Sequence, residues 1–237
     1  MKRIFSMLCL LLCTLLFTHA ATAQSIKGAW QMKNGGSATV TLVITDDYFM
    51  QSAFDKDSKA FYSSLGGKYK DAGNGMLEVV MEFNTEDKNL VGQTFQAGFK
   101  VTGSDLQITV DGDTQEWTRI DDGKAPLQGV WRISQREQEG KMNPITLAPR
   151  RTLKILSGSR FQWAAINIET GEFFGTGGGT YTFKDGKYTE NIEFFSRDSS
   201  RVGMSLSFDG KLDGDNWHHS GLSSKGDKIS EIWTRTK

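Results

Sequence analysis

The feature of this sequence that most limits its possible folds is an internal repeat. Five short motifs of the first half return in the same order in the second half, and only the segments between them change in length. The matching pairs are Gly28-Ala29-Trp30 with Gly129-Val130-Trp131, Phe61-Tyr62 with Phe173-Phe174, Gly66-Gly67 with Gly178-Gly179, Met81-Glu82-Phe83 with Ile192-Glu193-Phe194, and Trp117-Thr118-Arg119 with Trp233-Thr234-Arg235. One match could arise by chance, but five in order indicate a duplicated domain.

The duplication predicts two tandem domains of about 100 residues each. We expect the first domain at 24–122 and the second at 127–237. The segment from Asp121 to Pro126 is polar and contains Gly and Pro, which is typical of a short linker.

Each copy has the hydrophobic pattern of β-strands. Over 202–209, for example, apolar residues alternate with small or polar ones, which predicts a half-buried strand. Turn sequences such as Asn34-Gly35 and Asp185-Gly186 separate these runs. About eight runs occur in the second copy, near 129–135, 151–156, 160–168, 173–183, 187–195, 202–209, 216–222 and 228–236. This pattern favours an all-β protein of two up-and-down antiparallel barrels, because closing a barrel removes exposed strand edges.

The ends of each copy resemble lipocalins and the wider calycin superfamily. The first strand opens with Gly-x-Trp and the last closes with Trp-x-Arg, which pairs Trp30 with Arg119 and Trp131 with Arg235. The resemblance implies that each Arg packs across the ring of its Trp at the closed end of the barrel, a contact worth about 0.5–2 kcal/mol. It covers nearly the whole chain after residue 23, as two copies, and is closest to secreted bacterial lipocalin-like domains of unknown function. These four residues are therefore expected to be structural.

The first 23 residues have the pattern of a secretory signal peptide. Lys2 and Arg3 precede an apolar run from Met7 to Phe17, and Ala21-Thr22-Ala23 is a small-x-small cleavage site. We predict cleavage after Ala23 and a secreted or periplasmic mature chain. No later stretch is apolar and long enough to predict a membrane span.

Both cysteines of the chain, Cys9 and Cys13, lie inside this predicted signal peptide. The mature protein is therefore expected to have no disulfide. A lipoprotein anchor is the competing interpretation, but Leu8 and Leu12 precede the cysteines where a lipoprotein signal has a small residue. Basic and acidic residues are nearly balanced, which argues against nucleic acid as a partner.

The inward-facing positions of the second copy define a candidate ligand site. An eight-stranded barrel can be filled by side chains or can hold one small ligand. The candidate ligand-binding residues are Phe161, Trp163, Tyr181, Met204, Phe208, Trp217, His219 and Glu231. The alternative is that these side chains form a packed core.

The second copy also has a longer connection after its first strand. The first copy turns through Asn34-Gly35-Gly36, whereas the second inserts Gln135 to Arg150. In lipocalins the first interstrand loop covers the open end of the barrel, so the resemblance implies a lid over the second barrel at 136–150. An ordinary variable surface loop is the alternative.

Other motifs predict no cofactor. His218 and His219 are adjacent and would point to opposite faces of a strand, so they cannot bind one metal ion together. The glycine-rich segment 175–180 lacks the Lys-Ser/Thr end of a phosphate loop, and 209–215 misses the spacing of a calcium loop. We find no catalytic triad or nucleophile motif in the sequence.

Three function classes remain, in this order. The first is a carrier of a small apolar or amphipathic ligand, bound in the second barrel. The second is a non-catalytic module whose packed barrels present loops to a protein or glycan. The third is an enzyme with the calycin fold, because a fold does not determine function.

Overall fold

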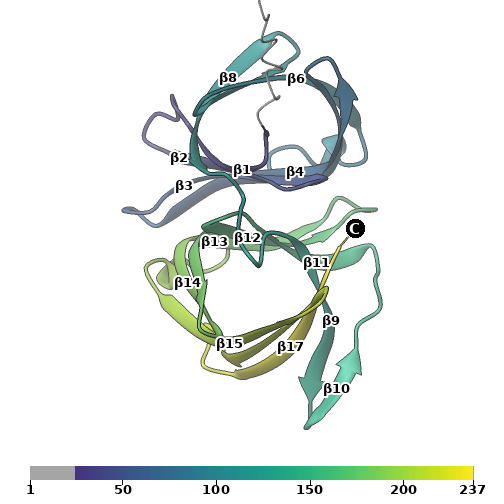
Figure 1. The fold of residues 1–237 in the computed structure, drawn as a ribbon, viewed down its shortest axis with the longest axis vertical. Helices are drawn as coiled ribbons and strands as arrows, with labels where there is room; N and C mark the ends of the chain where they lie inside the picture. Colours follow the sequence, from purple (N-terminus) through teal and green to yellow (C-terminus); the bar gives the residue numbers. More distant parts are fainter. Residues whose placement is uncertain (1–24, 237) are drawn as a thin grey trace, which may run out of the picture.

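The computed structural model describes residues 25–236, so the predicted signal peptide at 1–23 lies outside the described residues. Eight antiparallel strands close the first barrel, and each pairs with its neighbours in the sequence while the last returns to the first (Figure 1). These strands are β1 (Gly28–Met32), β2 (Thr39–Ile44), β3 (Tyr48–Asp55), β4 (Ala60–Gly73), β5 (Met76–Asn84), β6 (Thr94–Thr102), β7 (Asp105–Val110) and β8 (Asp113–Asp121).

The second half repeats this arrangement with one addition. Eight strands again close a barrel, through pairing of the last strand with the first, and a short ninth strand is attached outside it. The strands are β9 (Gly129–Gln138), β10 (Lys141–Pro144), β11 (Arg150–Leu156), β12 (Arg160–Asn167), β13 (Phe173–Lys184), β14 (Lys187–Phe195), β15 (Ser205–Asp213), β16 (Asn216–Leu222) and β17 (Lys228–Arg235). The expected all-β fold of two up-and-down barrels is confirmed.

One expected strand begins later than its hydrophobic pattern indicated. The pattern started a strand at residue 202, but a 3-10 turn occupies Ser199–Arg201 and β15 begins only at Ser205. Gly203 between them has a φ of +93°, a left-handed conformation that interrupts a strand. The first copy has the same turn at Lys88–Leu90.

Each barrel is closed at one end by an arginine over a tryptophan. The guanidinium carbon of Arg119 lies 3.9 Å from the ring centre of Trp30, and that of Arg235 lies 4.2 Å from the ring centre of Trp131. Both indole N–H groups donate to a backbone carbonyl four residues earlier, at 2.8 Å. Both arginines also donate to carbonyls of the segment that enters the first strand. The two copies therefore share this closure in detail.

The two barrels pack side against side, with strands β2 to β5 of the first against β11 to β14 of the second (Figure 1). One buried apolar cluster contains residues of both barrels. Phe54 stacks on Phe194 across the interface with ring centres 4.7 Å apart, and Gln162 Nε2 donates to Ser64 Oγ at 2.8 Å. The barrels thus share a core, in addition to the cores inside each of them.

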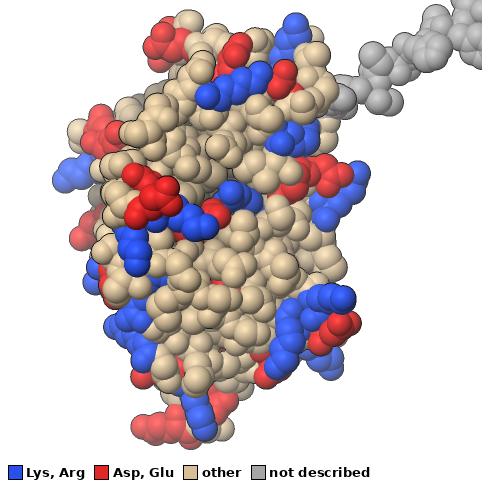
Figure 2. All heavy atoms as spheres, turned by 90° about the vertical axis from the view of Figure 1, so that its left-hand side faces the viewer, with Lys and Arg blue, Asp and Glu red and all other residues tan. Residues whose placement is uncertain are grey.

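The segment expected as a simple linker anchors one barrel to the other. Asp121 ends β8, and its carboxylate accepts hydrogen bonds from the side chains of Ser157 and Ser159 and from the backbone N–H of Gly158. Burial raises the pKa of Asp121, but these hydrogen bonds outweigh it, and the pKa lies below the ordinary value of 3.8. On the face shown in Figure 2, charges of both signs are scattered over the surface.

Candidate functional site

The interior of the second barrel contains a buried ion pair. Lys154 on β11 and Glu190 on β14 are 5% and 6% exposed, and Lys154 Nζ lies 2.6 Å from Glu190 Oε1. The hydroxyl of Tyr188 donates to the same carboxylate oxygen at 2.8 Å. Alternation along both strands points these side chains inward, where their charges are removed from water.

Aromatic rings surround the ammonium group of Lys154. Its Nζ lies 4.9 Å from the ring centre of Trp233, 5.3 Å from that of Tyr188, 5.5 Å from that of Trp217 and 5.7 Å from that of Phe161. An ammonium group within about 6 Å of an aromatic face is attracted to it. The rings and Glu190 together offset part of the cost of burying this charge.

The first barrel has apolar residues at the equivalent positions. Trp30 pairs with Leu42 where Trp131 pairs with Lys154, and Tyr69 pairs with Val79 where Tyr181 pairs with Glu190. In the same way Ile108 occupies the place of His219. The same fold therefore forms without these polar groups.

Glu231 on β17 forms a second buried ionic contact nearer the surface. Its Oε1 lies 2.7 Å from Nη2 of Arg136 and accepts a hydrogen bond from Nε of the same residue at 2.9 Å. Its Oε2 accepts from the indole N–H of Trp233 at 2.9 Å. Glu231 is 6% exposed, whereas the side chain of Arg136 is 46% exposed. Arg136 thus connects the interior to solvent.

His219 on β16 is buried without a hydrogen bond. It is 3% exposed, and neither ring nitrogen has a hydrogen-bond partner among the described protein atoms. Its Nδ1 lies 3.8 Å from Glu231 Oε2, beyond hydrogen-bond distance. Burial, and next the positive charge of Lys154, lower its pKa well below 6.5. The ring is therefore neutral at neutral pH, with one N–H donor and one nitrogen acceptor available.

These groups line a cavity of about 430 Å³ in the second barrel, within the range of small-molecule sites. Its wall is aromatic and aliphatic apart from Thr152, Gly178, the polar groups described above and residues of the β16–β17 connection. Five of the eight predicted binding residues line it: Phe161, Trp163, Phe208, His219 and Glu231.

The other three predicted binding residues lie elsewhere. Tyr181 is buried and donates its hydroxyl to the carbonyl of Ser157 at 2.7 Å. Trp217 is fully buried and packs edge-on against Trp131, outside the cavity lining. Met204 precedes β15 and is also outside the lining, because the turn at Ser199–Arg201 delays that strand.

The expected lid at 136–150 is wrong. β9 continues to Gln138 and forms a hairpin with β10, which extends beyond the barrel (Figure 1). From this segment only Arg136 lines the interior cavity. Ser223, Ser224 and Asp227, on the loop between β16 and β17, line it instead. Backbone pairing extends the strand here, which a loop-length comparison could not reveal.

Lys154 and Glu190 are not among the residues that the sequence pattern singles out. A lysine is rarely buried, so the residue type gave no reason to place it inside a barrel. The available signal was the duplication itself, because Leu42 and Val79 stand at the matching positions of the first copy. Within residues 25–236, no group of three or more His, Cys, Asp or Glu is arranged to hold a metal ion.

A model of a known protein family matches the second barrel. Residues 126–237 match the family model of a domain of unknown function, DUF4488. The eight-stranded up-and-down topology and the arginine-over-tryptophan closure occur in both barrels. The fold is lipocalin-like, in tandem. Of the described residues, none belongs to a helix long and apolar enough to cross a membrane.

Two solved structures show similarity at low sequence identity. A lipocalin-like protein from Bacteroides uniformis is 14% identical, with a TM-score of 0.33, and the match covers 47% of this chain and 100% of that one. The vaccine antigen transferrin binding protein B from Haemophilus parasuis, as a tryptophan-to-alanine mutant, is 12% identical, with a TM-score of 0.23 and coverage of 83% and 60%. No curated protein matches the chain.

Proposed function

We propose that this protein is an exported carrier that binds a small amphipathic ligand inside its second barrel. The observation that carries the proposal is His219, a buried neutral imidazole without a hydrogen bond in the wall of a 430 Å³ cavity. A ligand that brings a hydroxyl, amide or carbonyl group would satisfy this ring, while its apolar part would contact Phe161, Trp163 and Phe208.

The difference between the copies supports this role. Burying an unpaired polar group costs about 1–3 kcal/mol, and a buried ion pair is often no more stabilising than apolar residues of similar size. The first barrel uses Leu42, Val79 and Ile108 at the matching positions. Stability alone therefore gives no reason for the polar set of the second barrel, whereas ligand recognition does.

The cavity also favours a carrier over the two alternatives. A packed interaction module would have a solid interior, and the second barrel contains a cavity. An acid–base pair is less well supported, because no hydrogen bond joins His219 to Glu231: Glu231 Oε2 accepts from the indole N–H of Trp233 and lies 3.8 Å from His219 Nδ1.

A neutral fluorescent probe, N-phenylnaphthylamine, tests binding. We expect its emission to rise on binding and the signal to be lost in Leu206→Trp, which fills the cavity. The matched control is Phe95→Trp, because Phe95 pairs with Val79 in the first barrel as Leu206 pairs with Glu190 in the second. No binding by the wild type, or equal loss in both variants, would contradict a site in the second barrel.

Export is tested separately by N-terminal sequencing of the protein released from cells that produce the full chain. We expect the mature protein to begin at Gln24. An uncleaved chain retained in the cytoplasm would contradict this part of the proposal.

A further inference from the structure

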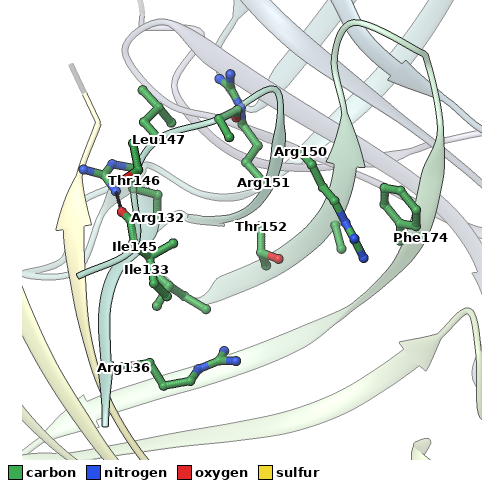
Figure 3. Close-up of a pocket in the computed structure, with 12 residues that line it drawn as sticks. Arg132, Ile133, Arg136, Ile145, Thr146, Leu147, Arg150, Arg151, Thr152 and Phe174 are labelled. Atoms are coloured by element: carbon green, nitrogen blue, oxygen red, sulfur yellow. Dashed lines mark hydrogen bonds between the residues drawn. The ribbon is translucent and has the colours of Figure 1, made fainter. Parts of the chain in front are cut away.

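A second cavity of about 270 Å³ lies where β9, β11 and the segment between β10 and β11 meet. Figure 3 shows Arg150 beside the ring of Phe174, with Ile145 and Leu147 on the other side of the cavity. Four of the 12 lining residues are arginines and none is acidic. The arginines are Arg132, Arg136, Arg150 and Arg151.

Three of these arginines form no ion pair with any carboxylate that the structure describes. Among the described residues, no salt bridge involves Arg132, Arg150 or Arg151. Arg132 and Arg151 donate to backbone carbonyls of Ile145 and Ala148 and so hold the lining segment in place. Arg150 is exposed, and its guanidinium carbon lies 4.4 Å from the Phe174 ring centre. The cavity therefore carries uncompensated positive charge next to apolar side chains.

This cavity adjoins the ligand site of the second barrel. Ile133, Arg136 and Thr152 line both cavities. Arg150, Thr152 and Lys154 lie on the same face of β11, because successive side chains of a strand point to opposite faces. This face leads from the arginine-lined cavity to the buried ion pair. A ligand about the length of both cavities could occupy them together.

We propose that the arginine-lined cavity is an anion subsite, and that the ligand is an amphipathic anion with a carboxylate or phosphate head. This inference rests on the proposed function. Inside the barrel, Lys154 is paired with Glu190 and Arg136 with Glu231, so a charged head placed there would have no free partner. In the outer cavity the guanidinium group of Arg150 offers the forked donors that fit carboxylate and phosphate oxygens. The rest of the ligand then extends inward, where its apolar part contacts Phe161 and Phe208 and a hydroxyl or carbonyl group on it reaches His219.

Calorimetric titration with dodecanoate, dodecyl phosphate and dodecanol tests the assignment. We expect both anions to bind about tenfold or more tightly than dodecanol, and to weaken as salt is added. Arg150→Gln is expected to weaken binding of the anions by roughly tenfold and to leave dodecanol unchanged. Arg150→Lys should restore part of the anion preference. Lys141→Gln, an exposed change on the neighbouring hairpin outside both cavities, should have no effect.

The outcomes separate this inference from the proposed function. If dodecanol binds as tightly as dodecanoate, or if Arg150→Gln changes nothing, the anion subsite is wrong and the carrier function stands. If none of the three ligands binds while N-phenylnaphthylamine does, the anion subsite is wrong and the carrier function stands; if that probe does not bind either, both proposals fail. Vesicles of anionic phospholipid are the second arm, because a lipid headgroup has the same chemistry. The wild type could sediment with the vesicles, lose this in Arg150→Gln, and bind no free amphiphile. That result would overturn the proposal of a free ligand.

Discussion

Lys154 and Glu190 are 36 residues apart in the sequence, and their charged atoms lie 2.6 Å apart inside the second barrel. In the first barrel Leu42 and Val79 take the same places in the strand register. The protein therefore contains its own comparison between an apolar and an ionic barrel interior. This comparison makes the energetic role of the pair measurable.

Lys154→Met should strongly destabilise the protein. The change leaves Glu190 as a buried charge with only the Tyr188 hydroxyl as a partner, and breaking such a pair costs about 3–5 kcal/mol. Urea unfolding followed by tryptophan fluorescence measures the loss.

The double variant Lys154→Leu/Glu190→Val should restore the stability to within about 1 kcal/mol of the wild type or above it, because it recreates the interior of the first barrel. The control is Lys187→Met, which breaks the exposed pair with Asp209 and should cost under about 1 kcal/mol. A double variant as unstable as Lys154→Met would show that the pair itself holds the barrel together.

His219→Leu should separate stability from binding. Removing two buried nitrogens without hydrogen bonds should leave stability unchanged or raise it by about 1–2 kcal/mol. Binding of ligands with a hydroxyl or carbonyl group should weaken by roughly tenfold, because the polar partner is lost. A variant that unfolds more easily yet binds normally would place His219 in a structural role.

The lowered pKa of His219 predicts that the stability of the protein depends on pH. Its folded pKa is lowered, so the unfolded chain binds the proton more readily, and stability falls as the pH decreases below about 6.5 toward the folded pKa. The slope is at most about 1.4 kcal/mol per pH unit for one group. We expect this part of the slope to be absent in His219→Leu and to persist in a variant of the exposed His218.

Asp121→Asn should loosen the contact between the barrels. The carboxylate accepts bonds of 2.7 and 2.8 Å from the Ser159 and Ser157 hydroxyls, and charged hydrogen bonds of this kind contribute about 1.5–3 kcal/mol. We expect a loss of roughly 2–4 kcal/mol in the free energy of unfolding at neutral pH.

Protonation of Asp121 in acid should destabilise the wild type as Asp121→Asn does at neutral pH. Because the folded pKa of Asp121 is lowered, its contribution is complete above about 3.8 and is lost as the pH falls through the folded pKa. Urea titrations should therefore give different free energies of unfolding for wild type and Asp121→Asn at neutral pH. The two values should converge at a pH below the folded pKa of Asp121. Asp113→Asn, at the exposed first residue of β8, is the control and should behave as the wild type throughout.

Arg119→Gln and Arg235→Gln should destabilise their barrels to a similar extent. Each change removes a guanidinium from a tryptophan face and breaks hydrogen bonds to the entry segment, which together contribute about 1–3 kcal/mol. Thermal unfolding measures both, with the exposed Lys211→Gln as a control. A large effect in only one copy would show that the closure is energetically unequal.

The sequence by itself determined the repeated architecture of this protein. Alternating apolar residues, turn dipeptides and the recurring Gly-x-Trp and Trp-x-Arg motifs are local signals, and they are sufficient to predict two closed barrels. Five of the eight candidate residues chosen from the sequence, among them Phe161, Trp163 and His219, line the cavity of the second barrel. Local patterns succeed there because neighbouring strands pair in sequence order.

Only the tertiary structure decided which side chains meet. Lys154 reaches Glu190 because closure of the barrel brings β11 and β14 across one interior, and no local pattern identifies a lysine as buried. The extension of β9 converted the expected lid into a hairpin and left Arg150 beside Phe174. Strand register and barrel closure fix these contacts over long sequence separations, so the chemistry of the cavity emerges only when the barrel is complete.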